Sequence, residues 1–230
     1  MTSPSPLLYD TYYHIYNRGN NGENIFVQER NYEYFMNLYF KYIDPIAETY
    51  AYCLLRNHFH VSLKTKSKEE IFPNLETLKV FSAGQNPVGQ GGLAIKGFGR
   101  GKKPLGSFLE QYLSQQFSNF FNAYSKSINN AYGRTGSLFE HPFGRVPITT
   151  DRQFWNVIAY IHQNPQKHKF VKDFRDWKWS SYGIILAEKP TKLKRDIVLD
   201  WFGGKESYLE LHKQWVSDAD AKWFAEDDFD

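Results

Sequence analysis

Two histidines separated by a single residue have the clearest chemical potential in this sequence. His58 and His60 stand in the stretch 56–64, where apolar residues alternate with polar ones. This alternation predicts a β-strand with both imidazoles side by side on its polar face. Two neutral imidazoles one strand repeat apart can share a divalent metal ion. A pair of solvent-facing histidines on an amphipathic strand would give the same pattern, so a metal site requires a third ligand.

A predicted helix farther along the chain supplies a candidate ligand. Thr150 and Gln153 form a capping-box pattern, and we expect the helix to close at Pro165. Tyr160 and Asn164 are four positions apart, so their side chains project from the same patch. A tyrosine on the polar side of a helix, one turn before an amide, is unusual in a pure packing element, although amphipathic tyrosines are common at rims. The buried stripe of this helix is Phe154, Val157, Ile158 and Ile161.

Length and composition limit what such a site can serve. The chain has 230 residues and a net charge of only +3, so one substantial domain is expected and any basic surface must come from local clustering. Its aromatic share of 18% is high enough for both core packing and base stacking. A single cysteine, Cys53, excludes an internal disulfide framework and fits a reducing compartment. We find no membrane-spanning run and no signal-peptide pattern, and therefore expect a soluble, cytoplasmic protein.

The remaining elements indicate the fold class. Hydrophobic patterns predict strands over 11–18 and 48–56 and helices over 29–43 and 107–132, the last opened by a capping box at Ser107. Strand, helix, strand, strand is the beginning of an α+β fold with an antiparallel pair. We therefore expect a central antiparallel β-sheet flanked by helices, with the strand of His58 and His60 at its centre.

Two segments have compositions suited to DNA. Residues 84–106 are rich in glycine and carry Lys96, Arg100, Lys102 and Lys103, as would a basic loop that follows a phosphate backbone or, equally, a solvated linker. They do not form a nucleotide-binding phosphate loop. Residues 133–145 interleave arginines with aromatic residues, which suits a single-strand surface. For Phe139 and Phe143 a position at the sheet edge is the alternative.

These motifs together resemble the HUH-type single-tyrosine transposases, most closely the REP-associated tyrosine transposases. The resemblance extends over roughly residues 11–186, and the Gly-rich stretch looks like an insertion. No Gly-Arg-Glu-Gly signature of some REP-binding members is present, which leaves the DNA target open. The matching motifs are Asn17-Arg18-Gly19, His58-Phe59-His60, Arg134-Thr135-Gly136-Ser137-Leu138-Phe139, Tyr160-Ile161-His162-Gln163-Asn164-Pro165 and Asp176-Trp177-Lys178-Trp179-Ser180-Ser181-Tyr182.

The resemblance implies a fold and a chemistry. The fold is a ferredoxin-like (RRM-like) HUH nuclease fold, with residues 1–170 as the nuclease domain and 171–230 as a C-terminal extension packed on it. His58, His60 and Asn164 would hold Mg²⁺ or Mn²⁺, and Tyr160 would cleave single-stranded DNA next to a hairpin through a 5′-phosphotyrosine. A monomer is favoured and a homodimer is possible. The side chains expected to contact DNA are Arg18, Lys64, Arg100, Lys102, Lys103, Arg134, Phe139 and Arg145.

Two other functions fit the same residues. A domesticated DNA-binding module would keep the fold without catalysis, and a metallohydrolase would use His58 and His60 to activate water without a covalent intermediate. A zinc site that adds His141 or His162 is also conceivable. We expect His162 to point away from the Tyr160 patch as a structural residue, and His141 to be an ordinary surface residue.

Overall fold

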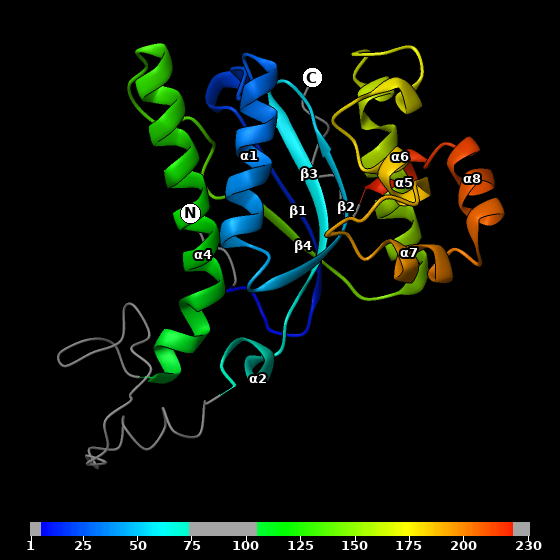
Figure 1. Cartoon of the computed structure of the whole chain (residues 1–230), viewed down its shortest axis with the longest axis horizontal. Helices are drawn as coiled ribbons and strands as arrows, with labels where there is room; N and C mark the ends of the chain where they lie inside the picture. Colours follow the sequence, from blue (N-terminus) through cyan, green and yellow to red (C-terminus); the bar gives the residue numbers. More distant parts are fainter. Residues whose placement is uncertain (1–5, 74–104, 223–230) are drawn as a thin grey trace.

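A computed structural model describes residues 6–73 and 105–222, and its centre is a four-stranded antiparallel sheet (Figure 1). The strands lie in the order β2-β3-β1-β4, so β3 and β1 are central. This confirms the predicted fold class and the central position of the histidine strand. The bounds of the strands are Tyr12–Arg18 for β1, Ala47–Leu54 for β2, His58–Thr65 for β3 and Gly144–Ile148 for β4.

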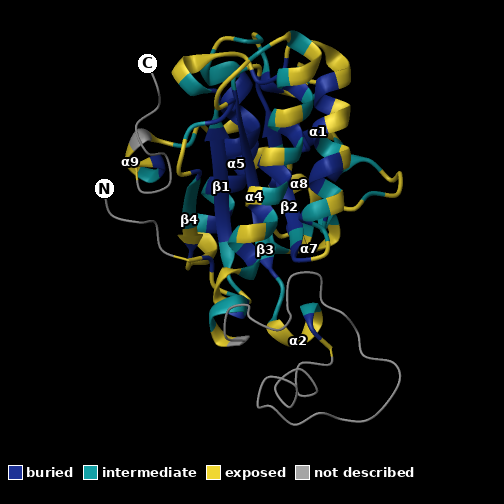
Figure 2. Cartoon of the chain, turned by 90° about the vertical axis from the view of Figure 1, so that its left-hand side faces the viewer, coloured by how far each residue is buried: buried dark blue, intermediate teal, exposed yellow. Residues whose placement is uncertain are grey.

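Helices cover both faces of the sheet. Figure 1 shows α1 and α4 on one side and α5 to α8 on the other. Figure 2 shows β1 and β2 largely buried behind helices with exposed outer faces, whereas β4 is mostly of intermediate burial. No described helix combines the length and apolar character needed to span a bilayer. The α-helices are α1 (Glu29–Tyr42), α2 (Lys68–Ile71), α4 (Leu105–Tyr132), α5 (Asp151–Lys167), α6 (Tyr182–Leu186), α7 (Arg195–Trp201), α8 (Lys205–Lys213) and α9 (Asp218–Ala221), with short 3-10 turns at Asn20–Gly22 and Phe174–Asp176.

The alternation of β3 separates two cores. Phe59, Val61 and Leu63 belong to the core beneath α1 and α4. The other face of β3 carries the histidines and is covered by α5. His58 and His60 are only 6% and 5% exposed, so they are not the solvent-facing pair of an amphipathic strand. Both sides of the strand are therefore buried.

Two helix boundaries differ from the sequence prediction. Helix α4 begins at Leu105, so Ser107 lies inside its first turn and the predicted capping box there is wrong. The capping box of Thr150 and Gln153 is confirmed, but α5 continues past Pro165 to Lys167. Proline removes only its own N–H from the ladder. The N–H of His168 still donates to the carbonyl of Asn164 at 2.9 Å, and this bond carries the helix through its last turn.

The segment after α5 shares a core with that helix. Phe154 of α5 packs on Trp201 of α7 with ring centroids 4.4 Å apart, and Tyr208 of α8 is fully buried. Residues 174–221 thus pack against α5. The division of the chain at residue 170 into a nuclease domain and a C-terminal extension stays a prediction.

Candidate active site

The tyrosine of α5 and the histidines of β3 lie next to each other. The rings of Tyr160 and His60 have centroids 5.6 Å apart and stand nearly perpendicular. His14, from the neighbouring strand β1, lies 6.0 Å from Tyr160 in the same edge-on arrangement. Tyr160 is 4% exposed, so the apolar stripe that docks α5 on the sheet also encloses its phenol.

A hydrogen bond at Nδ1 orients each of the two histidines, His58 and His60. Nδ1 of His58 lies 2.7 Å from Oδ1 of Asn57, an oxygen that can only accept, so this nitrogen carries the proton. The lone pair of His58 is then on Nε2. Nδ1 of His60 lies 3.0 Å from Nε2 of His14, while Nε2 of His60 is buried with no hydrogen-bond partner among the described residues. A hydrogen bond on one imidazole nitrogen is the usual way to prepare the other for a metal.

The side-chain oxygen of Asn164 is a third candidate metal ligand. Its Nδ2 donates to the carbonyl of Tyr160 at 3.0 Å, which fixes the amide. Its Oδ1 is buried and has no hydrogen-bond partner within the described part of the chain. Buried acceptors are nearly always satisfied, so an orphaned one in a folded protein needs an explanation. A divalent cation bound by His58, His60 and Asn164 would supply it, because imidazole nitrogens and an amide oxygen suit Mn²⁺ or Mg²⁺.

The electrostatics favour neutral imidazole at this place. Burial lowers the pKa of His60 well below its ordinary value, and the nearby His14, His58, His168 and Lys167 lower it further. The ring therefore keeps a lone pair at neutral pH. The amine of Lys167, 5.3 Å from the centre of the Tyr160 ring, would repel a bound cation, so the donor atoms of His58, His60 and Asn164 would have to compensate.

Four residues of this neighbourhood were missed in the sequence. His14 and Asn57 hold the histidines, the ring of His168 packs against His58 at 4.8 Å, and the amine of Lys167 lies 5.3 Å from the centre of the Tyr160 ring. The period-2 pattern of β1 does place His14 on one face with Tyr16. Only the sheet register identifies that face as the one opposite His60.

Two of the arginines expected to contact DNA form intramolecular ion pairs, and a third stacks on an aromatic ring. Arg18 forms an ion pair with Glu140 at 2.7 Å, and Arg134 forms one with Glu23. Arg145 stacks on Phe143 with its guanidinium 3.9 Å from the ring centre. Their contact with DNA stays a prediction. Arg100, Lys102 and Lys103, with the whole 84–104 part of the Gly-rich stretch, lie outside the described residues.

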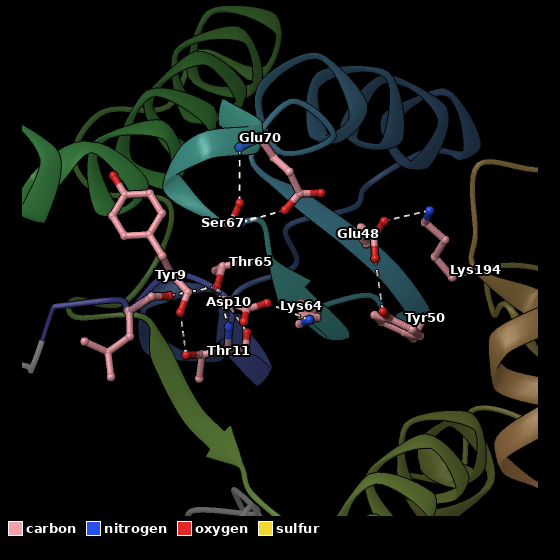
Figure 3. A network of polar contacts seen from close by, with 11 residues as sticks. Tyr9, Asp10, Thr11, Glu48, Tyr50, Lys64, Thr65, Ser67, Glu70 and Lys194 are labelled. Atoms are coloured by element: carbon pink, nitrogen blue, oxygen red, sulfur yellow. Dashed lines mark hydrogen bonds and ion pairs between the residues drawn. The ribbon is translucent and has the colours of Figure 1, made fainter. Parts of the chain in front are cut away.

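Lys64 lies at the far end of β3 from His58. Its amine pairs with Asp10 at 2.6 Å, in a polar network that also includes Thr65 and Glu48 (Figure 3). The side chain packs over the ring of Tyr12. Because a strand rises about 3.3 Å per residue, Lys64 is about 13 Å along the strand from His60, too far to contact the same phosphate.

Phe139 requires a correction. It was expected to present its ring for base stacking, but it is 1% exposed and packs on Phe121 and Tyr124 in the core. Its backbone forms an isolated bridge with Gly19 beyond the end of β1. The alternative, a sheet-edge residue, describes it correctly, because an aromatic ring beside this large cluster gains more from burial than from exposure.

The zinc alternative finds no support. His141 is exposed, and His162 is fully buried in contact with His212 and Ser181. Within residues 6–73 and 105–222, no group of three or more His, Cys, Asp or Glu side chains is placed to hold a metal. His162 is structural, as predicted.

Comparison with known proteins finds a similar structure but no similar sequence. Neither a protein-family model nor a curated protein matches the sequence. The structure is similar to that of a REP-associated tyrosine transposase solved bound to a REP hairpin, with a TM-score of 0.52 and 15% sequence identity. The similarity covers 83% of this chain and 88% of that chain, so the two proteins share their fold over nearly their whole length.

Proposed function

We propose that this protein is a REP-associated type of HUH tyrosine transposase: a metal-dependent endonuclease and strand transferase acting on single-stranded DNA beside a hairpin. The observation that carries the proposal is that Tyr160 of α5 packs edge-on against His60 of β3, while Asn164 lies one helical turn after Tyr160 and His168, one turn farther on, packs on His58. The Asn164 side-chain oxygen and Nε2 of His60 are both buried and have no hydrogen-bond partner among residues 6–73 and 105–222. The shared fold with a transposase bound to a REP hairpin supports the same proposal.

In the proposed reaction Tyr160 is the nucleophile, and other residues form the metal site. The phenol oxygen of Tyr160 attacks the phosphorus, the bond from phosphorus to the 3′ oxygen breaks, and the 5′ end stays attached to the tyrosine. The phenol loses one proton and the leaving 3′ oxygen gains one, so no proton is consumed overall. Attack by a 3′-hydroxyl reverses the reaction and joins strands without a nucleotide cofactor.

His58, His60 and Asn164 would hold the divalent ion, Mg²⁺ or Mn²⁺. When bound, the ion polarises the scissile phosphodiester and neutralises charge developing on it. The helix supports this function through spacing: because Tyr160 and Asn164 are one turn apart, α5 brings the nucleophile and an ion ligand to the sheet together.

A covalent-adduct assay tests the proposal. The protein is incubated with Mn²⁺ and labelled hairpin DNA that carries single-stranded flanks, then denatured and separated on a gel. We expect a labelled band at the mass of protein plus DNA. Tyr160→Phe should lose the band and keep DNA binding, because only the hydroxyl is removed. Tyr34→Phe, at an exposed side chain of α1, is the matched control and should behave as the wild type.

The rival functions predict different gels. Cleavage that survives Tyr160→Phe and leaves no adduct indicates a metallohydrolase that activates water. DNA binding with neither cleavage nor adduct, across a panel of hairpins and both metals, indicates a non-catalytic module. Either outcome overturns the proposal.

A further inference from the structure

We propose that His14 is a positioning residue that holds His60 in the tautomer required for metal binding and ties it to Tyr160. The inference rests on the proposed function and concerns a residue of β1 that lies outside the ligand set. Three features support it: a hydrogen bond, a ring arrangement and the strand register.

The hydrogen bond has two possible directions, and only one suits a ligand. Nε2 of His14 and Nδ1 of His60 are 3.0 Å apart. If His14 donates, His60 must carry its own proton on Nε2, which then becomes a buried donor with no acceptor in the described part of the chain. If His60 donates, its Nε2 has a lone pair that can bind a metal. His14 as acceptor therefore accounts for both nitrogens of His60 once the ion is bound.

The rings are arranged for this bond. The imidazoles of His14 and His60 have centroids 5.2 Å apart and planes only 17° apart, so the bond lies close to both ring planes. The Tyr160 ring stands perpendicular to both, at 6.0 Å from His14 and 5.6 Å from His60. Since His14 is fully buried, its orientation is determined by these neighbours and not by solvent.

The sheet register places His14 for this role. His14 lies directly opposite Ser62 on β3, which makes His60 its diagonal neighbour on the same face. Diagonal pairs on antiparallel strands are within reach of long or aromatic side chains. Because Ser62 is small, it leaves space on this face for an imidazole to reach across.

The test measures metal binding and not DNA cleavage. The affinity of the metal-free protein for Mn²⁺ is measured by the electron paramagnetic resonance of free Mn²⁺. His14→Leu removes the acceptor and should weaken Mn²⁺ binding about 10–100-fold, as loss of an outer hydrogen bond to a ligand does. His14→Gln places an amide oxygen near the position of Nε2 and should retain most of the affinity. His141→Leu, at an exposed histidine, is the matched control.

A second readout does not depend on a variant that folds. Long-range ¹H–¹⁵N NMR of the Mg²⁺-bound wild type should show His60 protonated at Nδ1. Observation of the proton on Nε2 would overturn the inference, as would unchanged Mn²⁺ affinity in a folded His14→Leu protein. His60→Ala separates failure of the proposed metal site from failure of the proposed role of His14. If it binds Mn²⁺ as the wild type does, the proposed metal site is wrong and the inference falls with it. If it loses Mn²⁺ while His14→Leu does not, only the role of His14 is wrong.

Discussion

Asn164 is the residue at which stability and function oppose each other. A buried acceptor without a hydrogen bond costs about 1–3 kcal/mol in the folded state. The chain keeps this cost at a place where the opposite end of the same amide is used structurally, by donation to the carbonyl of Tyr160. Binding of a metal ion to this oxygen for part of the time would explain why the chain keeps it despite the cost.

Asn164→Asp should separate the two effects. The carboxylate has nearly the same shape, but it cannot donate to Tyr160 and buries a charge, so unfolding without metal should become easier by about 1–3 kcal/mol. A charged oxygen binds divalent ions better, and the Mn²⁺ affinity should rise by about tenfold. Thermal unfolding with and without Mn²⁺ measures both effects. Asn156→Asp, farther back on α5, should change neither, and a variant insensitive to Mn²⁺ would remove Asn164 from the ligand set.

At this scale the sequence identifies the candidate ligands better than the residues that orient them. The spacing of His58 with His60 and of Tyr160 with Asn164 follows from strand and helix periods, which are local. Asn57 and His14 act through side-chain hydrogen bonds. Asn57 looks like a turn residue, and the role of His14 depends on strand pairing between distant segments. Phe139 was misjudged for the same reason, because burial is a property of the assembled core.

At the scale of elements, a chain of hydrogen bonds joins α5 to the C-terminal helices. The carbonyl of Tyr208 accepts from Nδ1 of His212, so Nε2 of His212 must accept from Nδ1 of His162 at 2.8 Å. Nε2 of His162 then accepts from the hydroxyl of Ser181, which itself accepts from the N–H of Tyr52 on β2. Every proton has one position. The helix that carries Tyr160 is thus bonded to α8 and to the sheet through neutral imidazoles.

This network predicts a stability that falls with acidity. Burial lowers the pKa of His212 from its ordinary 6.5 to about 4, although its bond to Tyr208 opposes the shift. Below pH 6.5 His212 binds a proton in the unfolded chain but stays neutral in the folded chain down to about pH 4. The contribution of His212 to stability is therefore complete above pH 6.5 and is lost as the pH falls toward 4. The loss from His212 between pH 7 and pH 5 should be about 2 kcal/mol.

Urea unfolding at pH 7, 6 and 5 measures the effect. His212→Gln should reduce the dependence on pH, while His141→Gln, at an exposed site, should leave it unchanged. The buried His162 has its pKa lowered in the same direction by burial and by His212, so some dependence should remain in the variant. Equal stability of the wild type at pH 7 and pH 5 would mean that the imidazoles accept protons without unfolding.

Some element boundaries follow a local signal in the sequence, whereas the capping-box pattern at Ser107 does not mark the start of α4. The capping box of α5 acts within one turn and is found. The helix predicted over 107–132 does end at Tyr132, where Gly133 adopts a positive φ of 63°. The end of α5 was misplaced because Pro165 is a strong local stop signal only when nothing holds the next turn. Here the His168 amide bond and the packing of Phe170 and Trp177, which contact each other, hold that turn in place.

For the whole molecule, the central feature is that the candidate site is closed. Tyr160, His58 and His60 are at most 6% exposed, so a phosphodiester cannot reach the phenol in this arrangement. His168, the first residue after α5, packs on His58, and the segment that follows is fastened to the sheet by the indole N–H of Trp177, which donates to the carbonyl of Leu54 at 2.9 Å. No sequence pattern reveals such closure, because it results from contacts between residues 168–177 and strands that are more than a hundred residues away in the sequence.

Opening of this segment should therefore limit the reaction. Trp177→Phe keeps the aromatic ring and removes one hydrogen bond worth about 1 kcal/mol, which should raise the open population and the rate of adduct formation about fivefold. Trp155→Phe makes the same chemical change at a bond to Trp201, also 2.9 Å long, away from the 168–177 segment, and should leave the rate unchanged. In hydrogen exchange, amides of 168–177 should exchange faster when hairpin DNA and Mn²⁺ bind, while those of β3 should not. If the adduct forms with these amides as protected as before and Trp177→Phe has no effect, access is gained by rotation of the Tyr160 side chain alone. The C-terminal extension would then stabilise α5 without controlling the site.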